Sequence, residues 1–157
     1  MVIGTENTGG GQPLEIGESA FRGCFGCGDE NDRSLALAFA LQEDCVVSHA
    51  EIAADYAGYP DFVHGGIVAT VLDEAMGWAM LHLAKRHGVT RGLNIRYRRP
   101  VPIGRTLTIR GRVIEIGDRT ATLYASIEDD RGRLLASAEG DWVVVRGERA
   151  SRPGARD

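Results

Sequence analysis

The hydrophobic positions follow two different periods along the chain, and the change of period separates its elements. Apolar and β-branched residues fill segments 34–41 and 45–52, with a polar break between them, which predicts two strands. From Gly65 the apolar positions recur at helical spacing and predict one long helix to about Arg86, with Gly88 as its stop. The predicted apolar stripe comprises Val68, Val71, Leu72, Ala75, Met76, Ala79 and Leu83.

After this helix the period becomes two. Four strands are predicted over 91–101, 106–117, 120–130 and 134–145, with a bulge after Gly111 and a loop over 54–63 before the helix. One long helix beside a run of hairpins indicates an α+β domain with an antiparallel sheet, because the connections are too short for parallel crossovers. Residues 1–20 and 147–157 are rich in glycine and polar residues, so we expect flexible segments around one domain over 21–146.

Composition excludes several classes of protein. The net charge of −4 argues against a nucleic-acid binder. No apolar stretch approaches the roughly 20 residues of a membrane span, so we expect no membrane segment. The N-terminus lacks a basic start and an apolar core, which predicts no signal peptide and a cytoplasmic location.

The cysteines pose a question of metal binding. Cys24 and Cys27 have C-x-x-C spacing, but a structural zinc needs four ligands, and no second such pair follows. A redox pair would be expected between a strand and a helix, and that context is absent. The odd total, with Cys45, favours reduced thiols. We therefore expect two cysteines in a structured N-terminal loop, with no metal and no cofactor.

Two carboxylates interrupt the predicted helix. Asp73 lies between the small residues Ala69 and Gly77 at helical spacing, whereas Glu74 lies between Thr70 and Trp78. An acid in a clearing of small residues suits contact with a substrate, and the alternative is a solvent-facing aspartate. Met80, further along the same side, suits either an acyl chain or the core.

The helix is preceded by "HGG", from His64 to Gly66. Two glycines at a helix N-terminus expose N–H groups that can bind an oxyanion, although an ordinary glycine turn has the same pattern. His64 is either a base or a positioning residue, and we favour positioning because nothing near it in sequence orients its ring. Residues 91–119 hold eight arginines and two acidic residues, a net charge of +6 that suits phosphates or solvated strand faces.

Three stretches together resemble one family. "HGG" followed after six residues by "DEAMG", "CFGCG" followed by "SLALAF", and "LNIRYRRPVPIG" are similar to the hotdog-fold acyl-CoA thioesterases of the PaaI-like group. The resemblance implies a sheet wrapped around the central helix, a homodimer or homotetramer (dimer of dimers), and active sites at the dimer interface. Some members carry Asn or Gln at the position of Gly58.

The resemblance also implies roles for particular residues. Asp73 is the catalytic carboxylate, the Gly66 N–H polarises the thioester carbonyl, and Thr90 lies near the reacting water. With His64 these form the expected catalytic set, and the expected acyl-CoA contacts are Gly65, Asn94, Arg96, Arg98 and Arg99. A thiolate leaves readily, so one base and an oxyanion site suffice without a Ser-His-Asp set. The expected function is acyl-CoA hydrolysis; the rivals are a non-catalytic acyl-CoA-binding module and a hotdog dehydratase.

Overall fold

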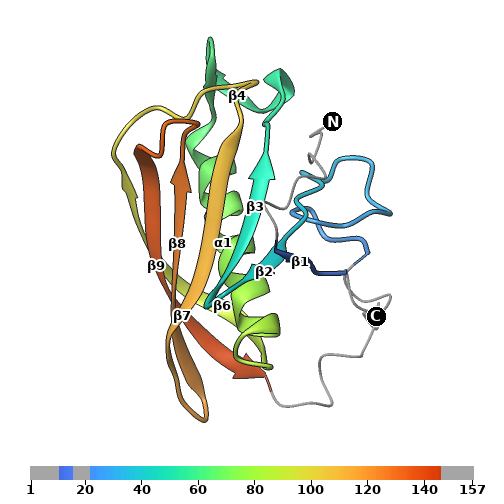
Figure 1. Cartoon of the computed structure of the whole chain (residues 1–157), viewed down its shortest axis with the longest axis vertical. Helices are drawn as coiled ribbons and strands as arrows, with labels where there is room; N and C mark the ends of the chain where they lie inside the picture. The colour runs from blue at the N-terminus through green and yellow to red at the C-terminus, as the bar shows by residue number, and fades with distance from the viewer. Residues whose placement is uncertain (1–10, 16–21, 146–157) are drawn as a thin grey trace, which may run out of the picture.

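A computed structural model describes residues 11–15 and 22–145 of the 157-residue chain. A seven-stranded antiparallel sheet curves around one helix, α1 (Gly65–His82), and a small hairpin precedes that helix (Figure 1). The sheet strands are β1 (Gln12–Pro13), β2 (Ala40–Gln42), β3 (Cys45–Ala50), β6 (His87–Tyr97), β7 (Leu107–Ile116), β8 (Thr120–Glu128) and β9 (Leu134–Val145). The hairpin is β4 (Ala57–Tyr59) with β5 (Phe62–Val63), after a short 3-10 turn at Ala54–Tyr56.

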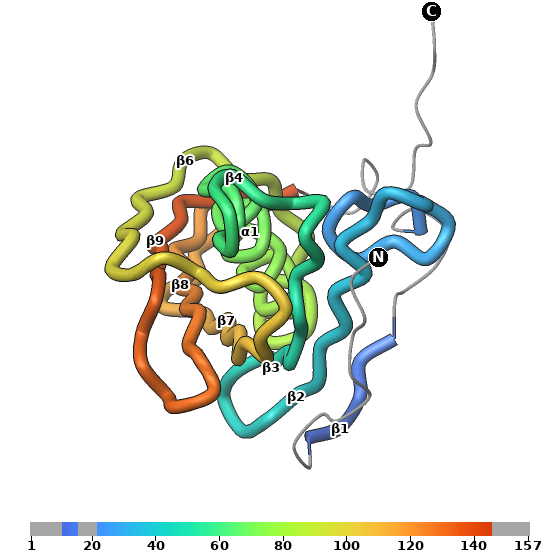
Figure 2. Tube along the Cα trace, turned by 90° about the horizontal axis from the view of Figure 1, so that it is seen from above, coloured from blue at the N-terminus to red at the C-terminus, as the bar shows by residue number. Residues whose placement is uncertain are grey.

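The strand order is β1-β2-β3-β7-β8-β9-β6, so β1 and β6 are the edges. Seen from above, the sheet wraps around α1, and the loop of residues 22–39 lies beside it on the side of β2 and β3 (Figure 2). The predicted α+β class and the single helix enclosed by an antiparallel sheet are therefore confirmed.

The predicted helix stripe forms the core with the sheet. All its members are buried except Leu83, which is partly exposed at the helix end. At Ala75 the helix backbone lies directly against β7, because a Cβ on Gly111 would collide with the Ala75 carbonyl. Glycine at this position lets the helix pack directly on the strand.

Two predicted boundaries are wrong. The helix ends at His82 rather than Arg86, because Leu83 caps it and Lys85 takes a left-handed conformation with φ of 54°. Gly88 is not the helix stop, since it pairs with Val144 inside β6. The chain thus turns into β6 four residues earlier than the sequence pattern indicated.

The first predicted strand is also shorter than expected. Of residues 34–41, only the last two belong to β2, while Leu35, Leu37 and Phe39 are buried without sheet pairing. The N–H groups of Leu35 and Leu37 donate instead to the carbonyls of Phe25 and Gly26 in the N-terminal loop, at 2.8 and 3.0 Å, and the Phe39 carbonyl accepts from the Leu14 N–H. The alternating burial of Leu35, Leu37 and Phe39 therefore has the period of a strand, although these residues form an irregular segment. The predicted loop over 54–63 contains β4 and β5, whereas the bulge after Gly111 is confirmed by a register shift between Val113 and Glu115.

The terminal segments are described only in part. Strand β1 lies within the segment 1–20 that we expected to be flexible, and Gln12 pairs there with Leu41. The remainder of that segment and the tail 147–157 lie outside the described residues. None of the helices in the described part of the chain is long and apolar enough to cross a membrane.

Candidate functional site

Asp73 lies half-buried in the middle of α1, facing strand β6. The Thr90 hydroxyl donates a hydrogen bond of 2.6 Å to Asp73 Oδ1. Burial raises the pKa of the Asp73 carboxyl above its ordinary value, and the Thr90 hydrogen bond opposes this rise. The structure thus brings together two of the residues that the sequence assigned to catalysis.

A bulge in β6 makes this contact feasible. Strand residues alternate between faces, so Thr90 would share the face of Asn94 and Arg96 in a regular strand. The register against β9 shifts between Thr90 and Gly92, which moves Thr90 to the face that Tyr97 turns toward α1. The sequence analysis did not predict this bulge, and Gly92 is the signal that could have indicated it.

A cavity of about 180 Å³ borders Asp73. Gly77 lines this cavity together with Asp73, and a Cβ on Gly77 would lie only 3.3 Å from the Trp142 ring, closer than ordinary van der Waals contact. Arg86 also lines the cavity and was missed by sequence reasoning, which placed it in the helix. The lining residues are Cys24, Cys27, Asp73, Glu74, Gly77, Trp78, Leu81, Arg86, His87, Gly88 and Trp142.

Glu74 differs from its neighbour in burial and partners. Its carboxylate accepts a hydrogen bond of 3.1 Å from Trp78 Nε1, as expected from helical spacing, and lies 3.6 Å from Cys24 Sγ. Burial raises the pKa of Glu74 to about 7. None of the ion pairs among the described residues involves Glu74.

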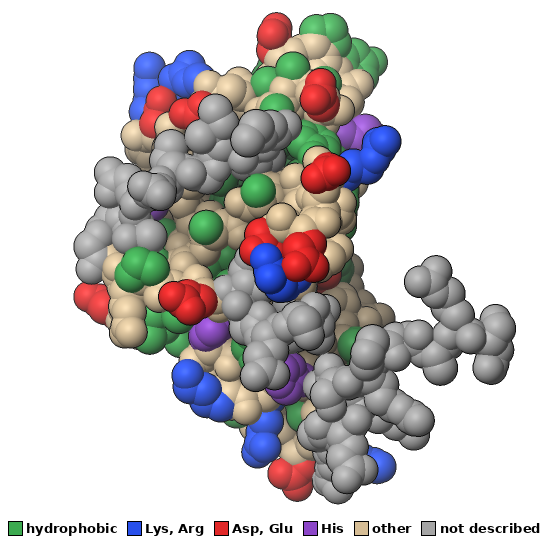
Figure 3. All heavy atoms as spheres, turned by 90° about the vertical axis from the view of Figure 1, so that its right-hand side faces the viewer, with side chains coloured by type: hydrophobic (Ala, Val, Ile, Leu, Met, Phe, Trp, Pro, Cys, Tyr) green, Lys and Arg blue, Asp and Glu red, His purple; other side chains and the backbone are tan. Residues whose placement is uncertain are grey.

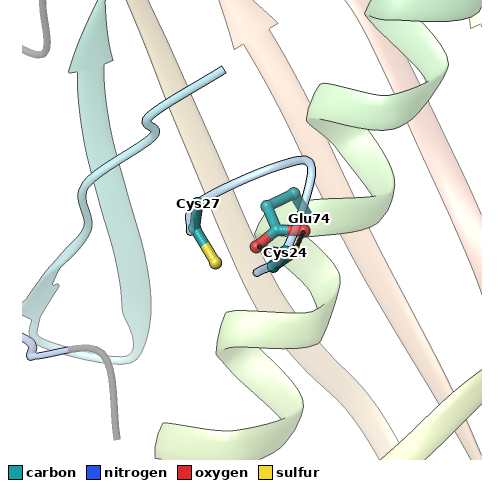
Figure 4. Close-up of side chains that lie close together, drawn as sticks. All are labelled: Cys24, Cys27 and Glu74. Atoms are coloured by element: carbon teal, nitrogen blue, oxygen red, sulfur yellow. Dashed lines mark hydrogen bonds between the residues drawn. The ribbon is translucent and has the colours of Figure 1, made fainter. Parts of the chain in front are cut away.

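The two N-terminal cysteines lie on the structured loop that the sequence analysis expected, against the helix turn of Glu74 (Figure 4). The Gly26 N–H donates to Cys24 Sγ at 3.3 Å. A hydrogen bond between the thiols lowers the pKa of Cys24 and raises that of Cys27, whose burial acts in the same direction. Two cysteines and a carboxylate therefore form a compact group that sequence spacing alone did not indicate.

The N-terminal end of α1 has a different construction. His64 is the N-cap, and its Nδ1 accepts a 2.9 Å hydrogen bond from the Gly66 N–H. This bond orients the ring, which supports the positioning role. It also engages the N–H that the resemblance assigns to the thioester carbonyl. Tyr97, a residue that the sequence analysis did not single out, donates to the Gly65 carbonyl at 2.8 Å and holds β6 against this end.

The two groups of residues do not form one site within one chain. Gly66 and Asp73 are seven positions apart on the same helix, which separates their backbones by about 10 Å at 1.5 Å per residue. A thioester carbonyl bonded to the Gly66 N–H therefore lies too far from Asp73 of the same chain for a water on that carboxylate to reach it.

The arginines fall into two groups. Arg98 and Arg99 line a second cavity with His64, Gly65 and Tyr97, whereas Asn94 and Arg96 line neither this cavity nor the one at Asp73. Arg99 also donates to the Leu134 carbonyl at 3.0 Å. Other arginines have partners within the chain: Arg105 pairs with Asp130, Arg110 with Glu128, and Arg112 lies over the Tyr124 ring. On the face in Figure 3, acidic and basic side chains are scattered rather than gathered by sign.

Met80, which suited either an acyl chain or the core, is 1% exposed and belongs to the core. It is therefore not at the rim of a site.

The chain is similar to known proteins in both sequence and fold. The family described as Thioesterase superfamily matches residues 61–136. The thioesterase superfamily protein RHA08564 superposes with a TM-score of 0.73 at 26% identity, covering 83% of this chain and 68% of that one. This chain has the hotdog fold. PaaI of E. coli shares the fold at a TM-score of 0.67 and 22% identity, covering 76% of this chain and 88% of that protein.

Relatives by sequence include acyl-coenzyme A thioesterases. The chain is 30% identical over 89 residues to THEM4 of Mus musculus, and 36% identical over 79 residues to THEM4 of Xenopus laevis. These matches cover 56% and 50% of this chain but only 38% and 35% of the relatives. A hypothetical thioesterase of Streptococcus pneumoniae TIGR4, solved with coenzyme A, superposes at a TM-score of 0.62 and 25% identity, over 66% of this chain and 83% of that one.

Proposed function

We propose that the protein hydrolyses an acyl-CoA thioester to a free acid and coenzyme A. The observation that carries this proposal is the half-buried Asp73, held by Thr90 at the wall of a cavity on a hotdog scaffold. The names of the THEM4 relatives and the coenzyme A in the pneumococcal structure support the substrate class.

In the proposed mechanism Asp73 acts on water. Its carboxylate takes a proton as the water attacks the thioester carbonyl, while the Thr90 hydroxyl keeps the carboxylate aligned. When the tetrahedral intermediate collapses, the C–S bond breaks, the free acid forms, and Asp73 returns the proton to the leaving thiolate of coenzyme A. The Gly66 N–H stabilises the oxyanion after the carbonyl oxygen replaces His64 Nδ1 as its acceptor. Arg98 and Arg99, beside the same helix end, hold the phosphates of coenzyme A, with Asn94 and Arg96 as further contacts.

The mechanism requires two copies of the chain, since Gly66 and Asp73 of one copy are about 10 Å apart along the helix. We therefore propose a homodimer, alone or within a homotetramer, in which one subunit supplies Asp73 and the other Gly66. Strand β6 supports this assembly because it is an 11-residue strand at the edge of the described sheet, and a long edge strand can pair with another chain. Its Val89, Leu93 and Tyr97 are 57%, 37% and 55% exposed. A monomeric mass by light scattering at micromolar concentration would contradict the assembly.

The second candidate is a non-catalytic acyl-CoA-binding module. One observation favours it: the Gly66 N–H already has an acceptor in His64, so the oxyanion site is not preformed. A thiol-release screen over short, long and aryl acyl-CoAs distinguishes the two. Steady release of free thiol supports hydrolysis, binding without turnover supports the module, and conversion of a 3-hydroxyacyl substrate without free thiol indicates a dehydratase.

A further inference from the structure

Three metal-ligating side chains from two separate elements meet beside the Asp73 cavity. Cys24 and Cys27 come from the N-terminal loop and Glu74 from α1, as Figure 4 shows, and their ligand atoms all lie within 4.8 Å of one another. All three side chains also line that cavity. The group therefore combines a pair of sulfur ligands, an oxygen ligand and an adjacent open space.

The distance between Cys24 and Glu74 matches a tetrahedral zinc site, and Cys27 has its ligand atom within 4.8 Å of both. Zinc–sulfur bonds of about 2.3 Å and zinc–oxygen bonds of about 2.1 Å place a sulfur and an oxygen on the same ion about 3.6 Å apart. Cys24 Sγ lies 3.6 Å from Glu74 Oε2 and 3.8 Å from Oε1. An ion can thus be accommodated between these atoms with little movement of either element.

The loop is shaped to hold the thiols against the carboxylate. The Gly26 N–H donates to Cys24 Sγ, an interaction that stabilises a thiolate. A Cβ on Gly26 would collide with the Glu74 carboxylate, and one on Gly28 would collide with the Arg22 carbonyl. Glycine at both positions lets the loop turn tightly and approach the helix.

A cation would also compensate the charge of the group. Glu74 is partly buried, and no ion pair within the described residues reaches it. A divalent cation would neutralise much of the negative charge of two thiolates and one carboxylate. Zn²⁺ suits this mixed set, because sulfur ligands disfavour Mg²⁺ and Ca²⁺, and the carboxylate is a poor ligand for Cu(I).

We propose that Cys24, Cys27 and Glu74 form a Zn²⁺ site with three protein ligands, whose fourth position opens to the cavity beside Asp73 and holds water. The metal fixes the N-terminal loop onto α1. The expectation of no metal rested on the absence of a second C-x-x-C pair. Glu74 is far from the cysteines in sequence, so only the fold makes it a third ligand.

The first test measures stoichiometry on the full chain. The protein is purified under reducing conditions, its free thiols are counted, and it is loaded with Zn²⁺, dialysed and subjected to elemental analysis. We expect about one zinc per chain, retained until a strong chelator is added. Cobalt substitution should give thiolate-to-cobalt charge-transfer bands and the intense visible bands of a tetrahedral site. Fully reduced protein that retains less than about a tenth of a zinc per chain would overturn the proposal.

Single substitutions test the ligands. Cys24→Ser should abolish stoichiometric binding, and Glu74→Gln should weaken zinc affinity by at least about tenfold in competition with a chromophoric chelator. The matched control is Cys45→Ser, because Cys45 lies elsewhere and donates to the Gln42 carbonyl. It should bind zinc as the unaltered chain does. Equal zinc content in Cys24→Ser and Cys45→Ser would contradict the assignment, and the measurement on the unaltered chain stands even if Cys24→Ser fails to fold.

The fourth position has its own readout. Azide added to the cobalt-loaded chain should shift the visible bands, since it replaces a water ligand that faces the cavity. An unchanged spectrum at saturating azide would show that the position is closed and would overturn that part of the proposal. None of these three measurements depends on thioester hydrolysis, so failure of the metal site is distinguishable from failure of the proposed activity.

Discussion

At its N-terminal end α1 presents backbone groups to an open, arginine-lined cavity, whereas in its middle it presents two carboxylates to a more enclosed one. Polar contacts at the first end involve Gly65, Gly66 and the His64 cap. The site in the middle of the helix depends on side chains from three elements: Thr90 on β6, the cysteines on the N-terminal loop, and Asp73 and Glu74 on the helix itself.

This difference suggests that the N-terminal end of α1 is suited to binding and that its middle is suited to reaction. Backbone N–H groups at a helix N-terminus and nearby arginines suit the oxygen atoms of a thioester and of phosphates. A half-buried carboxylate with an aligned hydroxyl suits proton transfer. About 10 Å along the helix separates its N-terminal end from Asp73 in its middle. The binding groups and the reacting carboxylate can therefore act on one substrate only if a second subunit brings them together.

The largest effect is expected at Asp73. Asp73→Asn removes the base and keeps the size of a side chain that borders the cavity. Thiol release should fall by roughly 10²–10⁴-fold, the usual loss of a general base, with little change in melting temperature. Glu74→Gln is the matched control and should lower turnover by less than about tenfold. A larger loss in Glu74→Gln than in Asp73→Asn would move the base to the neighbouring carboxylate.

The next largest effect is expected at Gly66, and it tests whether the Gly66 N–H and the Asp73 carboxylate form one site across subunits. Gly66→Pro removes the backbone N–H, and with it the bond to His64 Nδ1, in the first helical turn, where proline is tolerated. Turnover should fall by roughly 10²–10³-fold. Gly66→Ala keeps the N–H and is its control, although its Cβ would lie 3.1 Å from His64 Nδ1.

Mixing the two inactive variants sharpens this test. In a random mixture of Asp73→Asn and Gly66→Pro chains, half of the dimers are mixed and each has one intact site, so about a quarter of the activity should return. Recovery near zero, with subunit exchange verified by mass spectrometry, would mean that both groups act from the same chain.

The sequence predicted the local features of α1 but not its contacts with distant segments. The helix stripe, the "HGG" turn and the contrast between Asp73 and Glu74 follow from local spacing, and the structure bears out their placement. The Thr90 contact depends on a bulge in β6, and the pairing of Cys24 with Glu74 depends on how a loop crosses the helix. Such contacts between distant segments have no period to reveal them.

The early helix end shows the same limit. Apolar character continues past His82, but the chain must turn back to enter β6, and Lys85 adopts the left-handed conformation needed for that turn. Tertiary pairing of β6 with β9 therefore overrides local helical preference.

A smaller loss is expected from the hydroxyl that aligns Asp73. Thr90→Val keeps the shape and removes the 2.6 Å hydrogen bond, which is made to a charged group and is worth about 1.5–3 kcal/mol. Turnover should fall roughly tenfold to a hundredfold, mainly in kcat. Thr90→Ser retains the hydroxyl and should recover most of the rate. Equal rates in both variants would indicate that the hydroxyl does not act through Asp73.

The smallest effect is expected at His64, where the two interpretations of the N-terminal end differ most clearly. If the ring only caps the helix, His64→Ala removes the acceptor for the Gly66 N–H and lowers the free energy of unfolding by about 1 kcal/mol. Turnover should then change by no more than a few fold, since the freed N–H remains available to the thioester carbonyl. His64→Asn supplies another good N-cap and should restore stability in thermal unfolding. A loss of roughly 10² or more in kcat for both variants would make His64 a base rather than a cap, and the N-terminal end would then take part in proton transfer as well as binding.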